Sequence, residues 1–289
     1  MALLTVRGLS KRYEGFALEN ASFTLEAGYI MGFIGRNGAG KTTTLKSMLG
    51  LVSADAGQVW IDGMDFRKEE FACKQRIGVS FGGADYYPRA RLSDIASVTR
   101  RFYPDWDGAV YRELCGRFDL DENKRVRQLS AGMKVKFSLA LALSHRAKLL
   151  ILDEPTSGLD PVSRDELVEL FQRIVEDGEH SVLFSTHITS DLEKCADYIT
   201  YIQDGRITAS CDRDSFTGAY RLVRGAASQL TPELLSRLMG VRRHAFGFTA
   251  LAEAADLPLL SGLEIAPADL ESIMIHTSKE GFSHEASAV

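Results

Sequence analysis

The sequence predicts an α/β fold with a largely parallel sheet, a helical segment inserted between its strands and a smaller C-terminal region. Short apolar strands alternate with helical patterns along most of the chain, which is typical of a parallel sheet covered by helices. The apolar spacing becomes helical between about residues 93 and 145. The pattern changes again after about residue 215, and a chain of 289 residues is long enough for about two structural units.

Strands dominate the first part of the chain, where glycines separate runs of alternating or continuous apolar residues. We expect strands at residues 3–6, 17–25, 30–34, 58–61 and 77–81. The third of these strands runs directly into a glycine-rich loop. Residues 41–49, which follow this loop, are predicted to form a helix.

Strands return after the helical segment. They are predicted at residues 149–152 and 181–185, with a helix over residues 163–176 between them. This alternation indicates the parallel core. The helical block that precedes it is therefore an inserted subdomain, at about residues 83–145.

The region after residue 215 differs from the rest of the chain. Helices are predicted at residues 231–238 and 267–275, because a proline lies at or near the first turn of each. We therefore expect a main domain over residues 1–215 and a C-terminal accessory region over residues 216–289, for which no motif indicates a role.

The composition excludes several classes of protein. Lys and Arg number 34 and Asp and Glu 39, so the net charge is −5, and such a mildly acidic chain is not expected to bind nucleic acid. Apolar runs such as residues 137–143 are far shorter than the roughly 18 residues that cross a bilayer. The N-terminus shows no signal-peptide pattern, and the 4 scattered cysteines are expected to be free thiols. These features predict a cytoplasmic protein.

Residues 35–42 fit the phosphate-binding loop (Walker A) pattern G-x-x-x-x-G-K-[ST]. Glycines let backbone N–H groups turn toward phosphates, and the N-terminus of the following helix adds partial positive charge. Lys41 is predicted to reach the β- and γ-phosphates, and the Thr42 hydroxyl to ligate Mg²⁺. The alternative, a plain glycine-rich turn, is disfavoured by the position between a strand and a helix. The candidate nucleotide-binding residues of the loop are Gly35, Asn37, Gly38, Ala39, Gly40, Lys41, Thr42 and Thr43.

An apolar strand that ends in two carboxylates narrows the class of nucleotide-binding protein. Asp153 is predicted to hold Mg²⁺ through its water shell, and Glu154 to polarise the attacking water as general base. The alternative is that both carboxylates only cap the end of the strand. The phosphate loop upstream favours the catalytic interpretation.

A serine-glycine turn, Ser130 to Gly132, opens a predicted helix 23 residues before Asp153. By itself such a turn is usually an N-cap. Between the two nucleotide motifs, however, it makes the chain resemble the ATP-binding subunits of ABC transporters over about residues 1–215. The resemblance implies a P-loop NTPase fold with a mixed sheet core, an inserted helical subdomain and a small C-terminal extension. It also implies an ATPase that uses ATP and Mg²⁺.

The same resemblance implies roles for residues outside the two nucleotide motifs. Ser130 and Gly132 match the signature loop, which implies contact with the γ-phosphate of ATP held by the opposite subunit. Asp160 matches the loop that links the two sites, and His187 matches the switch histidine that senses the γ-phosphate. Tyr13 matches the aromatic residue that stacks on adenine. A structural histidine and an ordinary surface tyrosine are the alternatives for the last two.

The chain departs from the family pattern at two places. Ala131 and Met133 stand where the signature loop commonly has Gly and Gln, which affects the geometry of the serine contact. Gly82 and Gly83 stand where the family usually has Gln or an acidic residue. We hypothesise that Asp85 replaces that group at Mg²⁺, the alternative being that it caps a turn.

Aromatic residues are concentrated between residues 86 and 106. They are Tyr86, Tyr87, Phe102, Tyr103 and Trp106. Two interpretations remain open, the small core of the helical subdomain and a docking surface for a membrane subunit, since aromatic residues are favoured at interface centres. The block FYPDWD resembles a bacterial subgroup of these subunits that serves exporter-like systems.

We therefore expect an ATP-binding and hydrolysing subunit that powers a membrane ABC transporter, exporter-like, from the inner face of the cell membrane. The expected partners are a separate transmembrane permease and a second ATP-binding subunit, identical or paralogous, with ATP held between the two. Two alternatives are a soluble ABC-type ATPase that acts on ribosomes or DNA, and a nucleotide-sensing regulatory module. The motifs do not specify the transported substrate, the direction of transport or the composition of the dimer.

Overall fold

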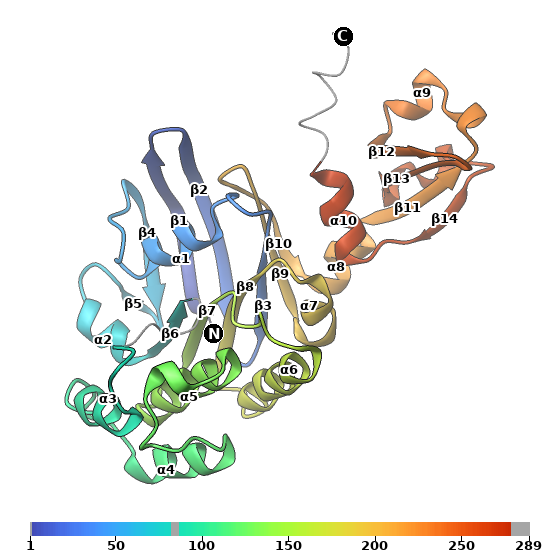
Figure 1. The fold of residues 1–289 in the computed structure, drawn as a ribbon. Helices are drawn as coiled ribbons and strands as arrows, with labels where there is room; N and C mark the ends of the chain where they lie inside the picture. Colours follow the sequence, from blue (N-terminus) through green and yellow to red (C-terminus); the bar gives the residue numbers. More distant parts are fainter. Residues whose placement is uncertain (1, 82–86, 279–289) are drawn as a thin grey trace. The chain divides into compact units, whose positions relative to one another are not determined.

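The structure of the chain, a computed structural model, describes residues 2–81 and 87–278 (Figure 1). The chain divides into two compact units, residues 1–210 and residues 211–289. Within the described ranges, none of the helices is long and apolar enough to cross a membrane.

An antiparallel sheet forms one layer of the first unit. It has the strand order β2-β1-β4-β5. The strands are β1 (Ala2–Tyr13), β2 (Phe16–Glu26), β4 (Ala56–Ile61) and β5 (Met64–Asp65). The strands predicted in this part of the sequence are confirmed, and the structure shows that they form a sheet separate from the parallel one.

The second sheet of this unit has the order β10-β9-β3-β8-β7-β6. Its strands are β3 (Ile30–Ile34), β6 (Ile77–Phe81), β7 (Leu149–Asp153), β8 (Ser181–Thr186), β9 (Tyr198–Gln203) and β10 (Arg206–Asp212). Strands β9, β3, β8, β7 and β6 run parallel. Every residue of β3, β7 and β8 is buried, as expected for central strands covered on both faces. The predicted α/β fold is therefore confirmed, although β9 and β10 were not predicted.

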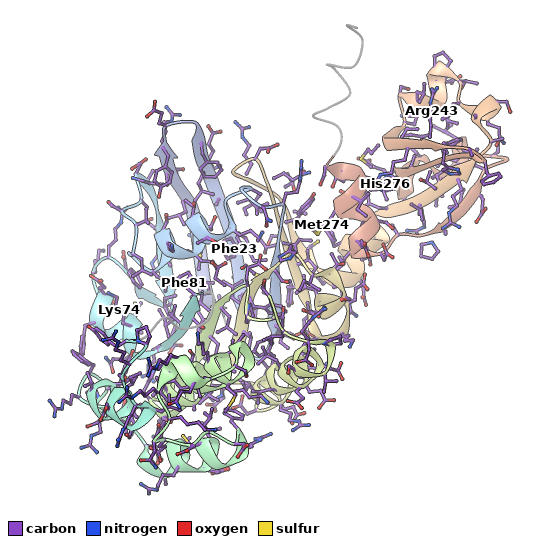
Figure 2. The ribbon with its side chains drawn as sticks, viewed as in Figure 1. Phe23, Lys74, Phe81, Arg243, Met274 and His276 are labelled. Carbon is purple, nitrogen blue, oxygen red and sulfur yellow. The ribbon has the colours of Figure 1, made fainter. Side chains whose placement is uncertain are left out.

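The core of the first unit is formed by side chains from both sheets and from the helix that follows β3. Phe23 of the antiparallel sheet is an example: it is buried, and its ring centroid lies 5.6 Å from that of Phe33 in β3 (Figure 2). Burial of apolar side chains such as these stabilises the packing of one sheet on the other. This packing fixes β3, and so the loop that leaves it.

Eight helices accompany these sheets in the described part of the first unit. They are α1 (Lys41–Met48), α2 (Glu70–Gln75), α3 (Leu92–Thr99), α4 (Gly108–Arg117), the 3-10 helix η1 (Val126–Gln128), α5 (Ala131–Ser144), α6 (Pro161–Val175) and α7 (Thr189–Cys195). Figure 1 shows α3, α4 and α5 lying together, where the sequence predicts the helical subdomain. Asp160 caps α6 and Pro161 occupies its first turn, which explains why the helix begins there.

The second unit contains a sheet of four antiparallel strands that was not predicted. Its order is β12-β13-β11-β14, the order of a split βαβ, ferredoxin-like arrangement. The strands are β11 (Tyr220–Gly225), β12 (Leu238–His244), β13 (Gly247–Glu253) and β14 (Glu264–Pro267). The helices are α8 (Arg213–Gly218), η2 (Ala227–Gln229), α9 (Pro232–Leu235), η3 (Ala254–Leu259) and α10 (Leu270–Thr277).

The helix predicted at residues 231–238 is wrong beyond its first turn. Thr231 caps α9 and Pro232 starts it, but Leu238 belongs to β12, where it pairs with Ala252 of β13. The second predicted helix, residues 267–275, is found as α10. In this helix His276 Nδ1 donates to the Gly240 carbonyl at 2.7 Å, which ties α10 to β12 (Figure 2).

Candidate nucleotide site

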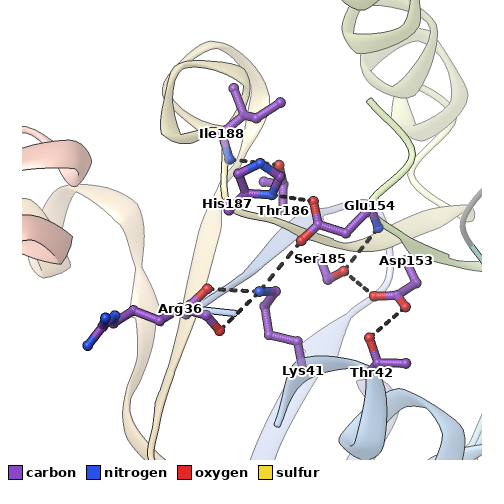
Figure 3. Close-up of polar contacts among 10 residues, drawn as sticks. Arg36, Lys41, Thr42, Asp153, Glu154, Ser185, Thr186, His187 and Ile188 are labelled. Carbon is purple, nitrogen blue, oxygen red and sulfur yellow. Dashed lines mark hydrogen bonds and ion pairs between the residues drawn. The ribbon is translucent and has the colours of Figure 1, made fainter. Parts of the chain in front are cut away.

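The phosphate loop connects β3 to α1 and encloses the side chain of Lys41. Lys41 is only 6% exposed, and its Nζ donates to the carbonyls of Gly35 at 2.8 Å and Arg36 at 3.4 Å (Figure 3). A Cβ on Gly35 would lie 2.4 Å from the carbonyl oxygen of Ile202, so no larger residue fits there. Gly40 adopts φ +114° directly before α1, whose N-terminus has no side-chain cap. The loop therefore holds an oriented ammonium beside a free helix N-terminus, a combination that suits phosphate.

Asp153 ends β7 and connects the phosphate loop to the parallel sheet. Thr42 Oγ1 donates to Asp153 Oδ2 at 2.8 Å, and Ser185 Oγ donates to Asp153 Oδ1 at 2.5 Å (Figure 3). The register of the sheet pairs Asp153 with Ser185 of β8. Each carboxylate oxygen of this buried aspartate therefore has a hydroxyl partner, as a buried charge requires.

Glu154 lies between a lysine and a histidine. Its carboxylate is 2.7 Å from His187 Nδ1 through Oε2 and 3.5 Å from Lys41 Nζ through Oε1 (Figure 3). The backbone of Glu154 has a left-handed conformation, φ +50°, and its N–H donates to Ser185 Oγ at 3.1 Å. A non-glycine residue in this conformation is uncommon and is often found at functional sites.

Lys41, Thr42, Glu154 and His187 line one pocket of about 570 Å³. Its lining residues are Phe16, Arg36, Asn37, Gly38, Gly40, Lys41, Thr42, Thr43, Glu154, Ser157 and His187. The structure therefore brings together the phosphate loop, the general base candidate and His187, which lie far apart in the sequence. Such a convergence of charged and backbone groups in one concavity is what a phosphate ligand needs.

Phe16 lines this pocket, whereas Tyr13, whose contact with adenine stays a prediction, is not among its lining residues. Tyr13 ends β1 and is exposed, and it pairs with Phe16 across the turn between β1 and β2. Sequence reasoning missed Phe16, as well as Ser185, whose hydroxyl contacts Asp153 and the N–H of Glu154. The signal for Ser185 is a hydroxyl residue near the end of a fully buried strand.

The predicted residues that lie outside the lining of this pocket are Tyr13, Gly35, Ala39, Ser130, Gly132, Asp153 and Asp160. Ser130 caps α5, and its Oγ accepts from Met133 N at 3.2 Å. Asp160 caps α6, and hydrogen bonds from the Ser163 hydroxyl and from the backbone N–H groups of Ser163 and Val162 lower the pKa of its carboxyl. Gly132 lies near the Asp160 loop, since its Cβ position is 3.6 Å from Leu159.

Two other expectations have different outcomes. Gly82 and the hypothesis about Asp85 lie outside the described residues. The described aromatic residues between 87 and 106 differ in burial, and a docking role for them stays a prediction. Tyr87 and Phe102 are exposed, whereas the Tyr103 ring stacks on His145 at 3.7 Å.

The fold and the site together define a P-loop ATPase. Residues 18–157 match the family model described as ABC transporter. The ABC transporter ATP-binding protein YtrB of Bacillus subtilis (strain 168) is 33% identical over 219 residues, 75% of each chain. The Nod factor export ATP-binding protein I of Ralstonia nicotianae (strain ATCC BAA-1114 / GMI1000) is 31% identical over 212 residues, 71% of this chain and 65% of the relative.

A solved structure described as the ATP binding subunit of an ABC transporter is 28% identical and superposes with a TM-score of 0.67. The match covers 74% of this chain and 91% of that structure. The chain therefore belongs to the family of ABC transporter ATP-binding proteins. It is an ATP-binding ATPase subunit of a transporter, as the sequence motifs predict.

Proposed function

We propose that this chain hydrolyses ATP at a site completed by a second ATP-binding subunit and so drives export through a separate transmembrane permease. The observation that carries the proposal is the position of Glu154. Its carboxylate contacts both His187 and Lys41 and lies next to the Asp153–Thr42 pair. The candidate base Glu154 and the candidate phosphate-binding cation Lys41 thus line one pocket, next to the Thr42–Asp153 pair that would hold the metal.

Thr42 and Asp153 would hold Mg²⁺. Hydroxyl and carboxylate oxygens are the ligands that Mg²⁺ prefers, and this ion is commonly held by one or two protein groups plus substrate phosphates. Thr42 Oγ1 donates to Asp153 Oδ2 at 2.8 Å, so the hydroxyl that would ligate the ion lies beside the carboxylate that would hold its water shell. No group of three or more acidic, His or Cys residues that could hold a metal occurs among residues 2–81 and 87–278, which agrees with a site completed by phosphates. Bound Mg²⁺ neutralises charge on the β- and γ-phosphates.

The residues of this chain would divide the chemistry as follows. Lys41, oriented by the carbonyls of its own loop, binds the terminal phosphates as a point charge. Glu154 accepts a proton from the attacking water, and His187 orients the Glu154 carboxylate through the 2.7 Å contact. Phe16, with Tyr13 beside it, offers an aromatic surface to the adenine base.

Ser130, Gly132 and Asp160 are proposed to act on the site of the partner subunit. None of them lines the pocket of its own chain, and the start of α5 contacts the Asp160 loop. The hydroxyl of Ser130 and the N-terminus of α5 would meet the γ-phosphate from the opposite side. The chain would then function as a homodimer or as one half of a heterodimer.

A second cavity, of about 470 Å³, is proposed to dock an apolar segment of the permease. It is formed by residues of α2, β6, α3 and α5, together with Phe102, Tyr103 and His145. Phe71 and Phe102 line it and are more than 60% exposed, at 67% and 63%. Large apolar side chains exposed together favour an interaction surface. Docking there would place the chain on the inner face of the membrane.

The direction of transport is proposed from the relatives. One of them is named for Nod factor export, which favours movement out of the cell. The cargo would be selected by the permease.

Replacement of Glu154 by Gln tests the proposal. Loss of the base should lower the rate of phosphate release by about 10²- to 10⁴-fold, while ATP affinity is kept. Both quantities are measured on the purified chain, with Glu113→Gln, an exposed change in α4, as control. Wild-type turnover in the Glu154 variant would refute the assignment.

A further inference from the structure

An ion pair between the buried Asp191 and the partly buried Arg164, called the buried pair below, joins α6 to α7. Nη2 of Arg164 in α6 lies 2.5 Å from Oδ1 of Asp191 in α7 and donates to Ser190 Oγ at 3.1 Å. Asp191 is only 3% exposed. Removal of the Asp191 charge from water is costly, and apolar residues in place of such a pair often leave a protein equally stable or more stable. Stability alone therefore gives little reason for charged residues at this position.

Both partners of the ion pair are bonded to segments of the nucleotide site. The N–H of Arg164 donates to the carbonyl of Asp160 at 3.0 Å, in the first turn of α6. The N–H of Asp191 donates to the carbonyl of Ile188 at 3.3 Å, the residue directly after His187. Asp160 lies four positions before Arg164, and His187 lies four positions before Asp191. The ion pair therefore connects the starts of two helices.

We propose that Arg164 and Asp191 are positioning residues that fix the Asp160 loop and His187 relative to each other. When a second subunit contacts Asp160, α6 and α7 move as one body, and His187 is set against Glu154. The inference rests on the proposed function, which gives Asp160 its contact with the partner subunit and Glu154 its role as base. The ion pair itself lies outside the pocket lining, so it acts on turnover and not on ATP binding.

A matched control exists on the same two helices. Lys194 of α7 contacts Asp165 of α6 at 2.5 Å, but their side chains are 56% and 52% exposed. Exposed pairs contribute little, typically about 0–1 kcal/mol. The control pair therefore joins the same two helices through exposed side chains.

The experiment replaces both charges of the buried pair, Arg164→Met with Asp191→Leu, in the full chain. Because neither charge is left alone, the variant is expected to fold and to unfold at or above the wild-type temperature. The kcat for ATP should fall about 10- to 100-fold, as expected when catalytic groups are misplaced. The KM for ATP should change by less than about 2-fold, since the pocket lining is intact. The control, Lys194→Met with Asp165→Leu, should keep the wild-type kcat.

Two further variants keep the inference falsifiable. Arg164→Lys retains the charge and should recover part of the kcat, and Asp191→Asn gives the same readout if the double variant does not fold. Wild-type kcat in the double variant, or in Asp191→Asn when that variant is used, would overturn the inference. An equal loss in the buried and control pairs would also overturn it. Glu154→Gln separates the two proposals. If this variant is inactive while the buried-pair variant is fully active, the positioning role is refuted and the proposed function stands.

Discussion

The side chain of Lys41 is held on three sides, by two carbonyls of its own loop and by the Glu154 carboxylate. Because the ammonium is already fixed in this way, it loses little conformational freedom when it forms charge-assisted hydrogen bonds with phosphate. Lys41 is therefore expected to contribute directly to the affinity for ATP.

Lys41→Ala should weaken ATP binding by about 10- to 100-fold, since a hydrogen bond to a charged group contributes about 1.5–3 kcal/mol. Equilibrium binding of a fluorescent ATP analogue measures the affinity. Lys46 belongs to the same helix, but it lies over the Phe81 ring, so Lys46→Ala serves as control. Equal affinities for the Lys41 variant and the wild type would contradict the phosphate role.

At the scale of elements, His145 joins the end of α5 to the loop after α3. Its ring is 5% exposed and stacks on Tyr103 with the planes 14° apart. Burial lowers the pKa of His145 to about 4, because the protonated ring would lose its hydration. Between about pH 6.5 and pH 4 the unfolded chain therefore binds a proton that the folded chain does not.

The free energy of unfolding should consequently fall as the pH is lowered through this window, by on the order of 3 kcal/mol from this residue. His145→Phe keeps the stacking and should lose this part of the pH dependence. Urea unfolding at pH 7 and pH 5, followed by the fluorescence of Trp60 and Trp106, measures the difference in the first unit. His244→Gln, an exposed change in the second unit, is the control. Identical pH slopes for His145→Phe and the wild type would rule out the effect.

At the scale of the whole molecule, one chain carries one phosphate loop and one signature loop, and the two do not share a pocket. A Ser130→Arg chain and a Lys41→Ala chain should each be inactive alone. Mixed, they should form dimers in which one site contains neither change. ATPase activity of purified mixed dimers measures the recovery. No activity in verified mixed dimers would count against a site shared by two chains.

The docking cavity makes a separate prediction about the assembly. Phe102→Ser should leave the ATPase activity of the isolated chain unchanged, because Phe102 is not part of the nucleotide pocket. It should lower copurification of the chain with its permease from membranes, since truncated apolar anchors lose much of an interface's binding energy. Phe246→Ser, at a 94% exposed phenylalanine of the second unit, is the matched control. Undiminished copurification would show that the permease does not bind at this cavity.

The sequence by itself determined the phosphate loop, the carboxylate pair and the α/β class. These features are local: glycines set the loop conformation, and apolar strands lead directly into the residues that act. The order of the motifs then indicated the family, because an isolated serine-glycine turn or histidine has many structural explanations.

Only the tertiary structure decided which distant residues support the site. Ser185 reaches Asp153 because β7 and β8 pair in one register, and Arg164 reaches Asp191 because α6 packs on α7. The helix predicted at residues 231–238 of the second unit was wrong for the same reason. Leu238 belongs to a strand because it pairs with Ala252 in β13. Strand pairing and helix packing are contacts between separate segments, and local residue patterns do not encode which partner each segment meets.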